Sequence, residues 1–216
     1  FITITSDQHF IDYGFSGTGT ENDPFIIENI ILPYHSYHNG IVVINTTKHF
    51  VIQNCILNAL LSGIFLENVA DGTATIKDNT FHDSDIGMSV VQSDGVKILN
   101  NTCGQFNNYG IILYYSNYSI VRNNTCYKNI YEGIISANSC FNKIEFNNCS
   151  YNFNVGIVVN NDLNDFISTN ICDYNFRGIV VDDTSNSTVT NNLFCYNNEW
   201  GGWFGNWDTS SKNNLT

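Results

Sequence analysis

The sequence predicts an all-β fold, a right-handed single-stranded parallel β-helix in which about eight coils of about 23 residues stack into a rod. Three observations predict it. A phrase of nearly fixed length recurs along the chain, each copy holds short runs rich in Ile, Val, Phe and Tyr, and Asn, Gly, Asp and Ser separate the runs. Such runs between turn residues are typical of strands, and a period in this range is typical of a solenoid.

The repeat is clearest over residues 108–176, where three copies of equal length, 108–130, 131–153 and 154–176, follow one another. Each copy has a Gly-Ile pair near its start, and these opening glycines recur at nearly constant intervals along the chain. They are Gly40, Gly63, Gly87, Gly110, Gly133, Gly156, Gly178 and Gly202. Leucine-rich repeats share this period but need a Leu-rich frame that is missing here, so three short strands per coil is the better interpretation.

Residues 1–39 do not follow the repeat. Residues 1–5 alternate like a strand, and a glycine-rich loop and the apolar run from Phe25 to Ile27 follow. We expect an irregular first coil with a cap over one end of the core, and we assign residues 40–216 to the regular coils. Because the chain starts at Phe1 and stops at Thr216 within a repeat, we expect a processed or trimmed start and coils that continue in a longer protein.

Asparagine recurs at two corners of the predicted coil. Stacked side-chain amides can hydrogen-bond from coil to coil, because an amide both donates and accepts. Asparagine also tolerates the left-handed backbone of a tight corner, and we expect the opening glycines to serve the same need. The first column is Asn79, Asn101, Asn124, Asn147 or Asn148, Asn170 and Asn192, and the second is Asn129, Asn152, Asn175 and Asn197.

Five of the seven cysteines fall at one constant interval, which matches the repeat, at a position that Phe81 and Ile56 occupy in earlier coils. These five are Cys103, Cys126, Cys149, Cys172 and Cys195. Exchange with Phe and Ile indicates a buried apolar position. Side chains in register on parallel strands present poor disulfide geometry, so we expect reduced thiols in the core.

The net charge of −12, with eight Lys and Arg residues in all and no basic cluster, makes nucleic acids and anionic membrane surfaces poor partners. No apolar run approaches membrane-spanning length, so we expect no membrane insertion.

The segment GTGTENDPFII over residues 17–27, followed by coils with Gly-Ile openings and Asn-Asn corners, resembles the NosD-like family of right-handed parallel β-helix repeats. The resemblance covers nearly the whole chain. It implies the fold and a secreted or cell-surface protein, since such repeats are common in archaeal and bacterial surface proteins. It implies no single activity, because the family includes a periplasmic protein that serves copper-enzyme maturation, carbohydrate-active enzymes and surface scaffolds.

Metal ligands are sparse in the sequence. A copper site needs His, Met or Cys gathered on one face, but the five histidines lie before the coils become regular and Met88 is the only methionine. The best carboxylate group is Asp162 with Asp182 and Asp183 of the next coil, which predicts at most a weak Ca²⁺ site. We therefore expect no cofactor beyond such a cation.

Catalytic residues are not indicated. Arg177 lies too far along its strand from Asp182 for a polysaccharide lyase centre. Asp182-Asp183 is similar to the paired aspartates of polygalacturonases, but the companion motifs of that family are missing.

Two surface features remain. The residues that follow the inward-pointing Ile of each coil form an outward apolar column, interrupted only by Ser89, and such a stripe usually marks a contact surface. This stripe is Val42, Phe65, Ile112, Ile135, Val158 and Val180. The second feature is exposed aromatic residues that could stack on sugar rings or make an end contact: Tyr114, Tyr115, Trp200, Trp203 and Trp207. Among the N-glycosylation sequons, Asn45, Asn117 and Asn186 fall in outer loops that a glycan could reach.

Taken together, these features predict a non-catalytic secreted or surface-exposed scaffold for self-assembly or adhesion. Its partners would be a second copy, or another domain or subunit, on the apolar stripe, with polysaccharide as a further ligand. The alternative is a carbohydrate-active enzyme of the same fold, a polysaccharide lyase or a glycoside hydrolase. A cleft lined by Asp with Lys or Arg would favour the enzyme, and a flat apolar face covered by a second copy would favour the scaffold.

Overall fold

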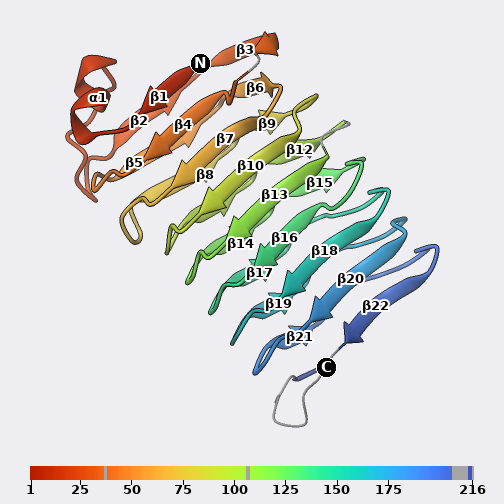
Figure 1. The fold of residues 1–216 in the computed structure, drawn as a ribbon. Helices are drawn as coiled ribbons and strands as arrows, with labels where there is room; N and C mark the ends of the chain where they lie inside the picture. The colour runs from red at the N-terminus through yellow and green to blue at the C-terminus, as the bar shows by residue number, and fades with distance from the viewer. Residues whose placement is uncertain (37, 106–107, 206–213, 216) are drawn as a thin grey trace.

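The computed structural model describes residues 1–36, 38–105, 108–205 and 214–215, and it is a right-handed parallel β-helix, as the sequence predicts. The chain passes through three sheets in turn, and successive coils stack along one axis (Figure 1). Equivalent residues of neighbouring coils pair in register, as Cys103 does with Cys126 and Ile134 with Ile157.

The first sheet has nine strands: β1 (Ile2–Ile4), β4 (Ile41–Ile44), β7 (Ser62–Glu67), β10 (Ile86–Val91), β13 (Tyr109–Tyr114), β16 (Ile134–Ala137), β18 (Val155–Asn160), β20 (Arg177–Asp182) and β22 (Trp200–Gly205). The second sheet also has nine: β2 (Phe25–Glu28), β5 (Phe50–Gln53), β8 (Ala74–Lys77), β11 (Lys97–Leu99), β14 (Ile120–Arg122), β17 (Lys143–Glu145), β19 (Phe166–Ser168), β21 (Thr188–Thr190) and β23 (Asn214–Leu215). The third sheet has five: β3 (Ile31–Ser36), β6 (Ile56–Ala59), β9 (Thr80–Phe81), β12 (Thr102–Gly104) and β15 (Thr125–Tyr127). Beyond β15, single parallel bridges such as Asn148 to Ile171 continue the third side.

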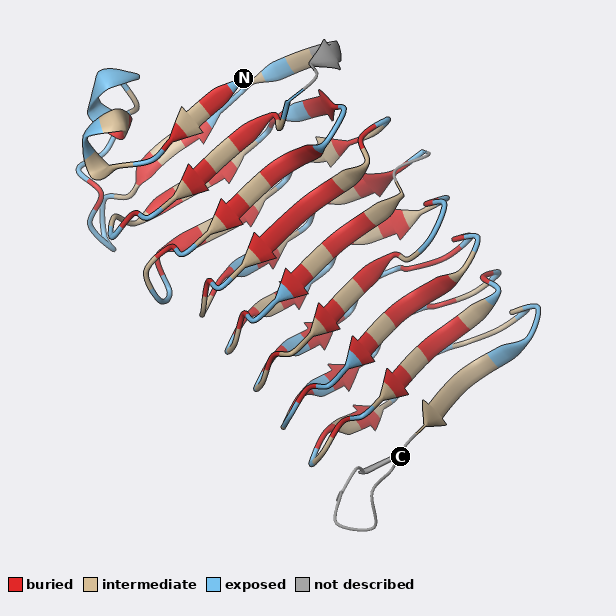
Figure 2. Ribbon diagram, viewed as in Figure 1, coloured by how far each residue is buried: buried red, intermediate tan, exposed pale blue. Residues whose placement is uncertain are grey.

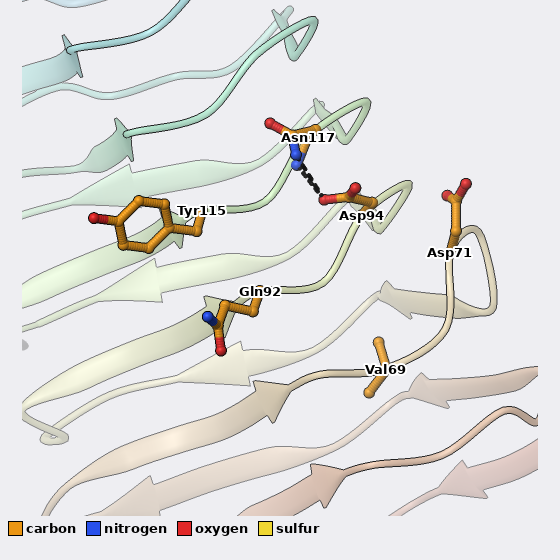
Figure 3. A pocket seen from close by; sticks show the side chains of 6 residues that line it. All are labelled: Val69, Asp71, Gln92, Asp94, Tyr115 and Asn117. Atoms are coloured by element: carbon orange, nitrogen blue, oxygen red, sulfur yellow. Dashed lines mark hydrogen bonds between the residues drawn. The ribbon is translucent and has the colours of Figure 1, made fainter.

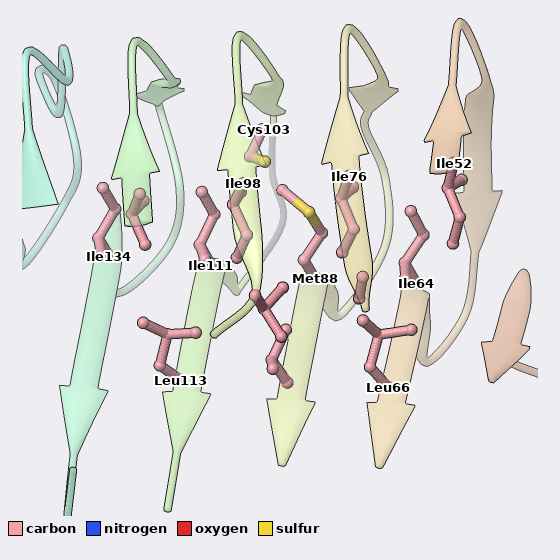
Figure 4. Close-up of a cluster of buried hydrophobic side chains, with 14 of the residues drawn as sticks. Ile52, Ile64, Leu66, Ile76, Met88, Ile98, Cys103, Ile111, Leu113 and Ile134 are labelled. Atoms are coloured by element: carbon pink, nitrogen blue, oxygen red, sulfur yellow. The ribbon is translucent and has the colours of Figure 1, made fainter. Parts of the chain in front are cut away.

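The core fills the space between the three sheets. Ile64, Met88 and Ile111 from the first sheet and Ile76 and Ile98 from the second point inward and are fully buried (Figure 4). Buried and half-buried residues alternate along the strands, as Figure 2 shows. Each fully buried aliphatic side chain stabilises the fold by about 1.5–3 kcal/mol relative to an exposed one, so the column in each sheet is the main source of stability.

The N-terminal segment supplies the first coil and a lid on its core. Strands β1, β2 and β3 pair with β4, β5 and β6. Helix α1 (Asp7–Asp12), which the sequence analysis did not anticipate, buries Phe10 against Phe25, with ring centroids 4.7 Å apart and planes 4° from parallel. No helix among the described residues is long and apolar enough to cross a membrane.

The first asparagine column is confirmed, with Asn147 rather than Asn148 in it. Each amide nitrogen donates to the Oδ1 atom of the next coil at 2.9–3.0 Å, from Asn79 down to Asn192. The expectation of a left-handed backbone at these residues is wrong by one position, because the residue before each amide has the positive φ, as in Asn100 and Asn123. The preceding residue makes the corner, and the amide then turns inward to form the ladder.

The opening glycines serve a different need from the expected one. None of Gly40, Gly63, Gly87, Gly110, Gly133, Gly156 or Gly178 has a positive φ. A Cβ atom on Gly133 would instead lie 2.6 Å from the carbonyl oxygen of Gly156, and the other six meet the next coil equally closely. Glycine is required because two backbones approach each other there. In the last coil the equivalent residue is Gly201, not Gly202.

The cysteine file is confirmed for Cys103, Cys126, Cys149 and Cys172, which are fully buried beneath Phe81. Two expectations are wrong. Leu57, not Ile56, occupies this position before Phe81, and Ile56 is exposed. Phe194, not Cys195, occupies it after Cys172, because the coil from Gly156 to Gly178 is one residue short. All seven cysteines are free thiols. Burial raises the pKa of the Cys103 and Cys149 thiols, which keeps them protonated and unreactive.

Candidate functional site

The outer face of the first sheet carries the apolar stripe in register. Val42 pairs with Phe65, Phe65 with Ser89, and Ser89 with Ile112. The column continues through Ile135, Val158 and Val180 to Trp203 of β22. Every apolar member is half-buried, because its neighbours along the column cover its flanks while the tip faces outward.

The outer face of the second sheet has a different composition. Its outward columns carry Lys97 and Lys143 on exposed positions, and Arg122 forms an ion pair with Glu145 of the next coil. These charged groups keep the outer face of the second sheet hydrated. The apolar stripe on the first sheet, all of it within the described residues, carries no charged side chain.

A polar hollow of about 400 Å³ lies at the corner between these two sheets (Figure 3). Asp71, Asp94 and Asn117 come from equivalent turns of three successive coils, and Gln92 and Tyr115 complete its wall. Asn117 donates to Asp94 Oδ1 through its backbone N–H at 2.8 Å and its side-chain amide at 3.1 Å. The hollow thus presents two carboxylates and two amides beside an exposed aromatic ring.

The predicted grouping of Asp162 with Asp182 and Asp183 does not form. Asn160 pairs with Asp182, after which the corner reverses the side-chain directions. Asp162 is fully buried and accepts hydrogen bonds from Ser139 N at 2.7 Å and from Ser136 Oγ. Asp182 and Asp183 face outward, and Asp183 is exposed at the positive-φ position of the turn. The expectation failed because counting residues from the glycine ignores this reversal.

Asp162 instead has a buried partner that was not predicted from the sequence. Asp165 lies in the same turn, is also buried, and accepts a hydrogen bond from Asn142 N at 2.8 Å. Burial and the neighbouring Asp162 raise the pKa of Asp165 to about 9. At neutral pH Asp165 is therefore protonated and can donate to Asp162. The sequence does contain a sign of this burial. Asp165 follows Ser119 and Asn142 at the interval of the repeat, so it occupies the same position in its coil as they do in theirs.

The predicted aromatic residues lie in two places. Tyr114 and Tyr115 contact each other edge to face at the end of β13, with centroids 4.4 Å apart. Trp200 is exposed and lies 4.9 Å from the guanidinium carbon of Arg177, while Trp203 ends the apolar stripe. Trp207 lies outside the described residues.

The three predicted sequon asparagines differ in access. Asn45 and Asn186 are exposed at corner positions with positive φ. Asn117 is half-buried, and its amide nitrogen donates to Asp94 while its Oδ1 accepts from Cys140 N.

The described residues do not fit a copper centre. They contain no group of three or more His, Cys, Asp and Glu side chains that could hold a metal ion. Met88 is sealed in the core, His9 is hydrogen-bonded to Thr5, and His82 contacts Asp83. Burial raises the pKa of the Cys103 and Cys149 thiols, which opposes their deprotonation to soft thiolate ligands.

Two groups of solved structures share the fold. The periplasmic alginate epimerase AlgG has a TM-score of 0.60 at 17% identity, and the match covers 77% of this chain and 47% of that one. The A-module of the mannuronan C-5 epimerase AlgE4 of Azotobacter vinelandii has a TM-score of 0.64 at 15% identity, over 88% of this chain and 63% of the module. This chain thus spans about half to two thirds of the structures it resembles. At these identities the likeness establishes the β-helix alone.

No functionally curated protein matches the sequence significantly. The family model described as "Periplasmic copper-binding protein (NosD)" matches residues 6–215, which is nearly the whole chain. The repeat, the N-terminal segment and the three-sheet coil all agree with that match. The chain belongs to the NosD family.

Proposed function

We propose that this chain is a non-catalytic scaffold outside the cytoplasm, and that two copies associate through the outer faces of their first sheets. The observation that carries the proposal is the uncharged apolar stripe from Val42 to Trp203, which crosses eight strands in register. Contiguous apolar surface of this extent is unusual on a monomer and typical of a contact face.

The size of the face suits a second copy. Eight strands at about 4.8 Å span roughly 34 Å, and strands of four to six residues are about 13–20 Å long. The flat area is then roughly 450–700 Å², close to the about 800 Å² per partner of a stable interface. Since a two-fold axis places the same patch on both sides, a column that is apolar at every position but Ser89 is complementary to itself.

The proposed location is supported by descriptions of relatives. The family description and the name of AlgG both refer to the periplasm. A rod that presents repeated surface outside the cytoplasm is suited to a structural role, in keeping with a stripe that carries no charged side chain. No step of the proposal requires bound copper.

Sedimentation velocity tests the proposal. We expect the wild type to sediment as a dimer at tens of micromolar, and Ile112→Glu with Val158→Glu to be monomeric, because carboxylates two coils apart cannot be buried without partners. The matched control is Ile120→Glu with Phe166→Glu, which are outward and two coils apart on the second sheet. A wild type that is monomeric at 100 µM, or a stripe variant that still dimerises, would contradict the proposal.

The hollow of Figure 3 favours a second candidate, a carbohydrate-active enzyme. Asp71 and Asp94 belong to adjacent coils, about 4.8 Å apart along the axis, which is near the carboxylate separation of retaining glycosidases. Under this alternative, purified protein would release reducing ends from polysaccharides, and Asp94→Asn would abolish the release. Dimerisation without any such activity would favour the scaffold.

A further inference from the structure

A second hollow lies on the third side of the rod, away from the apolar stripe. Its volume is about 370 Å³, within the range of small-molecule sites. Tyr127, Tyr151 and Tyr174 supply aromatic walls, and Asn148, Ser150 and Asp173 supply polar groups. None of these six residues carries a function predicted from the sequence, and the proposed dimer does not use them.

The tyrosine column along this hollow is ordered and exposed. Tyr151, Tyr174 and Tyr196 occupy equivalent corners of three successive coils, with ring centroids 4.8 and 4.9 Å apart and planes 2° and 15° from parallel. Parallel rings in contact at about 3.5 Å must be offset by roughly 3 Å to give these centroid distances, so part of each face stays open. The side chains are 53%, 46% and 74% exposed.

The backbone at these tyrosines is strained. Their φ angles are 62°, 56° and 56°, in the left-handed region that bulky residues avoid at a cost of about 1–2 kcal/mol each. Some positive-φ positions at other corners carry asparagine, as at Asn123 and Asn138, which adopts this conformation more easily, and others carry bulky residues, as at Phe141 and Phe146. Stacking offsets part of the cost, but exposed rings gain little from burial. Strain retained without a gain in packing is an indication of function.

The polar groups indicate which ligand would fit. Ser150 Oγ donates to Asn148 Oδ1 at 2.7 Å, and Asp173 Oδ1 accepts from Cys195 N at 2.6 Å, so both side chains are held in place. No basic residue lines the hollow, and the chain carries a net charge of −12. A polyanion would be repelled. Partly open aromatic faces beside fixed amide, hydroxyl and carboxylate groups match the C–H faces and hydroxyls of an uncharged sugar.

We propose that the hollow lined by Tyr127, Tyr151 and Tyr174 is a binding site for an uncharged polysaccharide, lying along the rod axis. The repeating column extends the site by one ring per coil to Tyr196. A linear chain of sugars would therefore contact successive tyrosines, while Asp173 and Asn148 would bind its hydroxyls.

Isothermal titration calorimetry with cellohexaose and mannohexaose as probes, and hexamannuronate as the anionic comparator, tests the proposal. We expect at least one neutral hexasaccharide to bind more tightly than hexamannuronate. Tyr174→Asn should weaken that binding at least tenfold with no loss of thermal stability, because asparagine relieves the backbone strain. Asp173→Asn should weaken it less.

The matched control is Tyr118→Asn. Tyr118 is also an exposed aromatic at positive φ, stacked on Phe141 at 5.0 Å, but it lies at a different corner. Its variant should bind like the wild type. The monomeric stripe variant should also bind normally, which separates this site from the proposed dimer. Binding of neither neutral probe, preference for hexamannuronate, or equal losses in Tyr174→Asn and Tyr118→Asn would each overturn the proposal.

Discussion

All three corners of the coil carry buried polar columns, and two of these corners differ in what their side chains can donate. The first asparagine column lies at the corner between the second sheet and the third side, and its amides run from Asn79 to Asn192. The corner between the first and second sheets carries mainly hydroxyls and carboxyls. Its two columns are Ser93, Ser116, Ser139 and Asp162, and Ser119, Asn142, Asp165 and Ser187.

The comparison shows why an amide can repeat without limit and a carboxylate cannot. Asn124 accepts from the backbone and side chain of Asn101 and donates to Ile98 O and Asn147 Oδ1, all at 2.9–3.0 Å. Every polar atom of the amide is used, and the next coil can repeat the pattern. An ionised carboxylate only accepts, so Asp162 and Asp165 can lie together only if they share a proton.

Removal of one ladder amide has the largest expected effect. Asn124→Ala would remove the acceptor of the Asn101 backbone N–H, one of the two acceptors of the Asn101 amide nitrogen, and the amide donor to Ile98 O, all in a buried site. We expect a loss of about 3–5 kcal/mol in the free energy of unfolding, measured by urea denaturation. The neighbouring Asn123→Gly, at an exposed positive-φ position, should cost less than about 0.5 kcal/mol. Equal effects of the two changes would refute a structural role for the ladder.

The carboxyl pair should give a pH-dependent stability. The pKa of Asp165 is about 9 in the folded chain and about 3.9 unfolded, so its stabilising contribution is complete below pH 4 and is lost as pH rises toward 9. Asp165→Asn cannot lose a proton. We expect it to match the wild type near pH 3.5 and to exceed it by more than about 1.4 kcal/mol at pH 8.5, in urea denaturation.

The exposed Asp183→Asn is the control for this pH profile and should follow the wild type throughout. A difference between Asp165→Asn and wild type that does not change with pH would show that the pair shares no proton.

The smallest effect is expected at the hydroxyl column. Ser116 Oγ accepts from Ser93 N and donates to Tyr114 O, both at 3.1 Å. Ser116→Ala leaves one buried N–H without an acceptor and should cost about 1 kcal/mol in thermal unfolding. A cost as large as that of Asn124→Ala would mean that the two corners do not differ as their donors suggest.

The sequence predicted the coil, the core columns and the asparagine ladder because each depends on repetition. Among the five cysteines, the predicted file was wrong only at Cys195, because a coil one residue shorter than its neighbours places Phe194 beneath Cys172. An alignment of the coils by a constant interval of residues does not show that one coil lacks a residue, whereas the pairing of strands in the structure does. Helix α1 was missed because six residues give too little periodicity to recognise.

The candidate sites were less predictable than the fold. The apolar stripe followed from alternation and lies where it was expected. Asp162 and the tyrosine hollow did not follow, because the direction of a side chain at a corner depends on which residue takes the positive φ. When the positive-φ residue shifts by one position, the side chains around the corner that pointed inward point outward, and the reverse.

The close backbone approach at the glycine column has a mechanical consequence. Each coil contacts mainly the coils directly above and below it, so force applied along the axis would be resisted at one junction at a time. A rod pulled from its ends should therefore lengthen in steps of roughly 75–80 Å, the contour length of a single coil. A protein built in this way could yield locally under tension while the rest of its length keeps its shape.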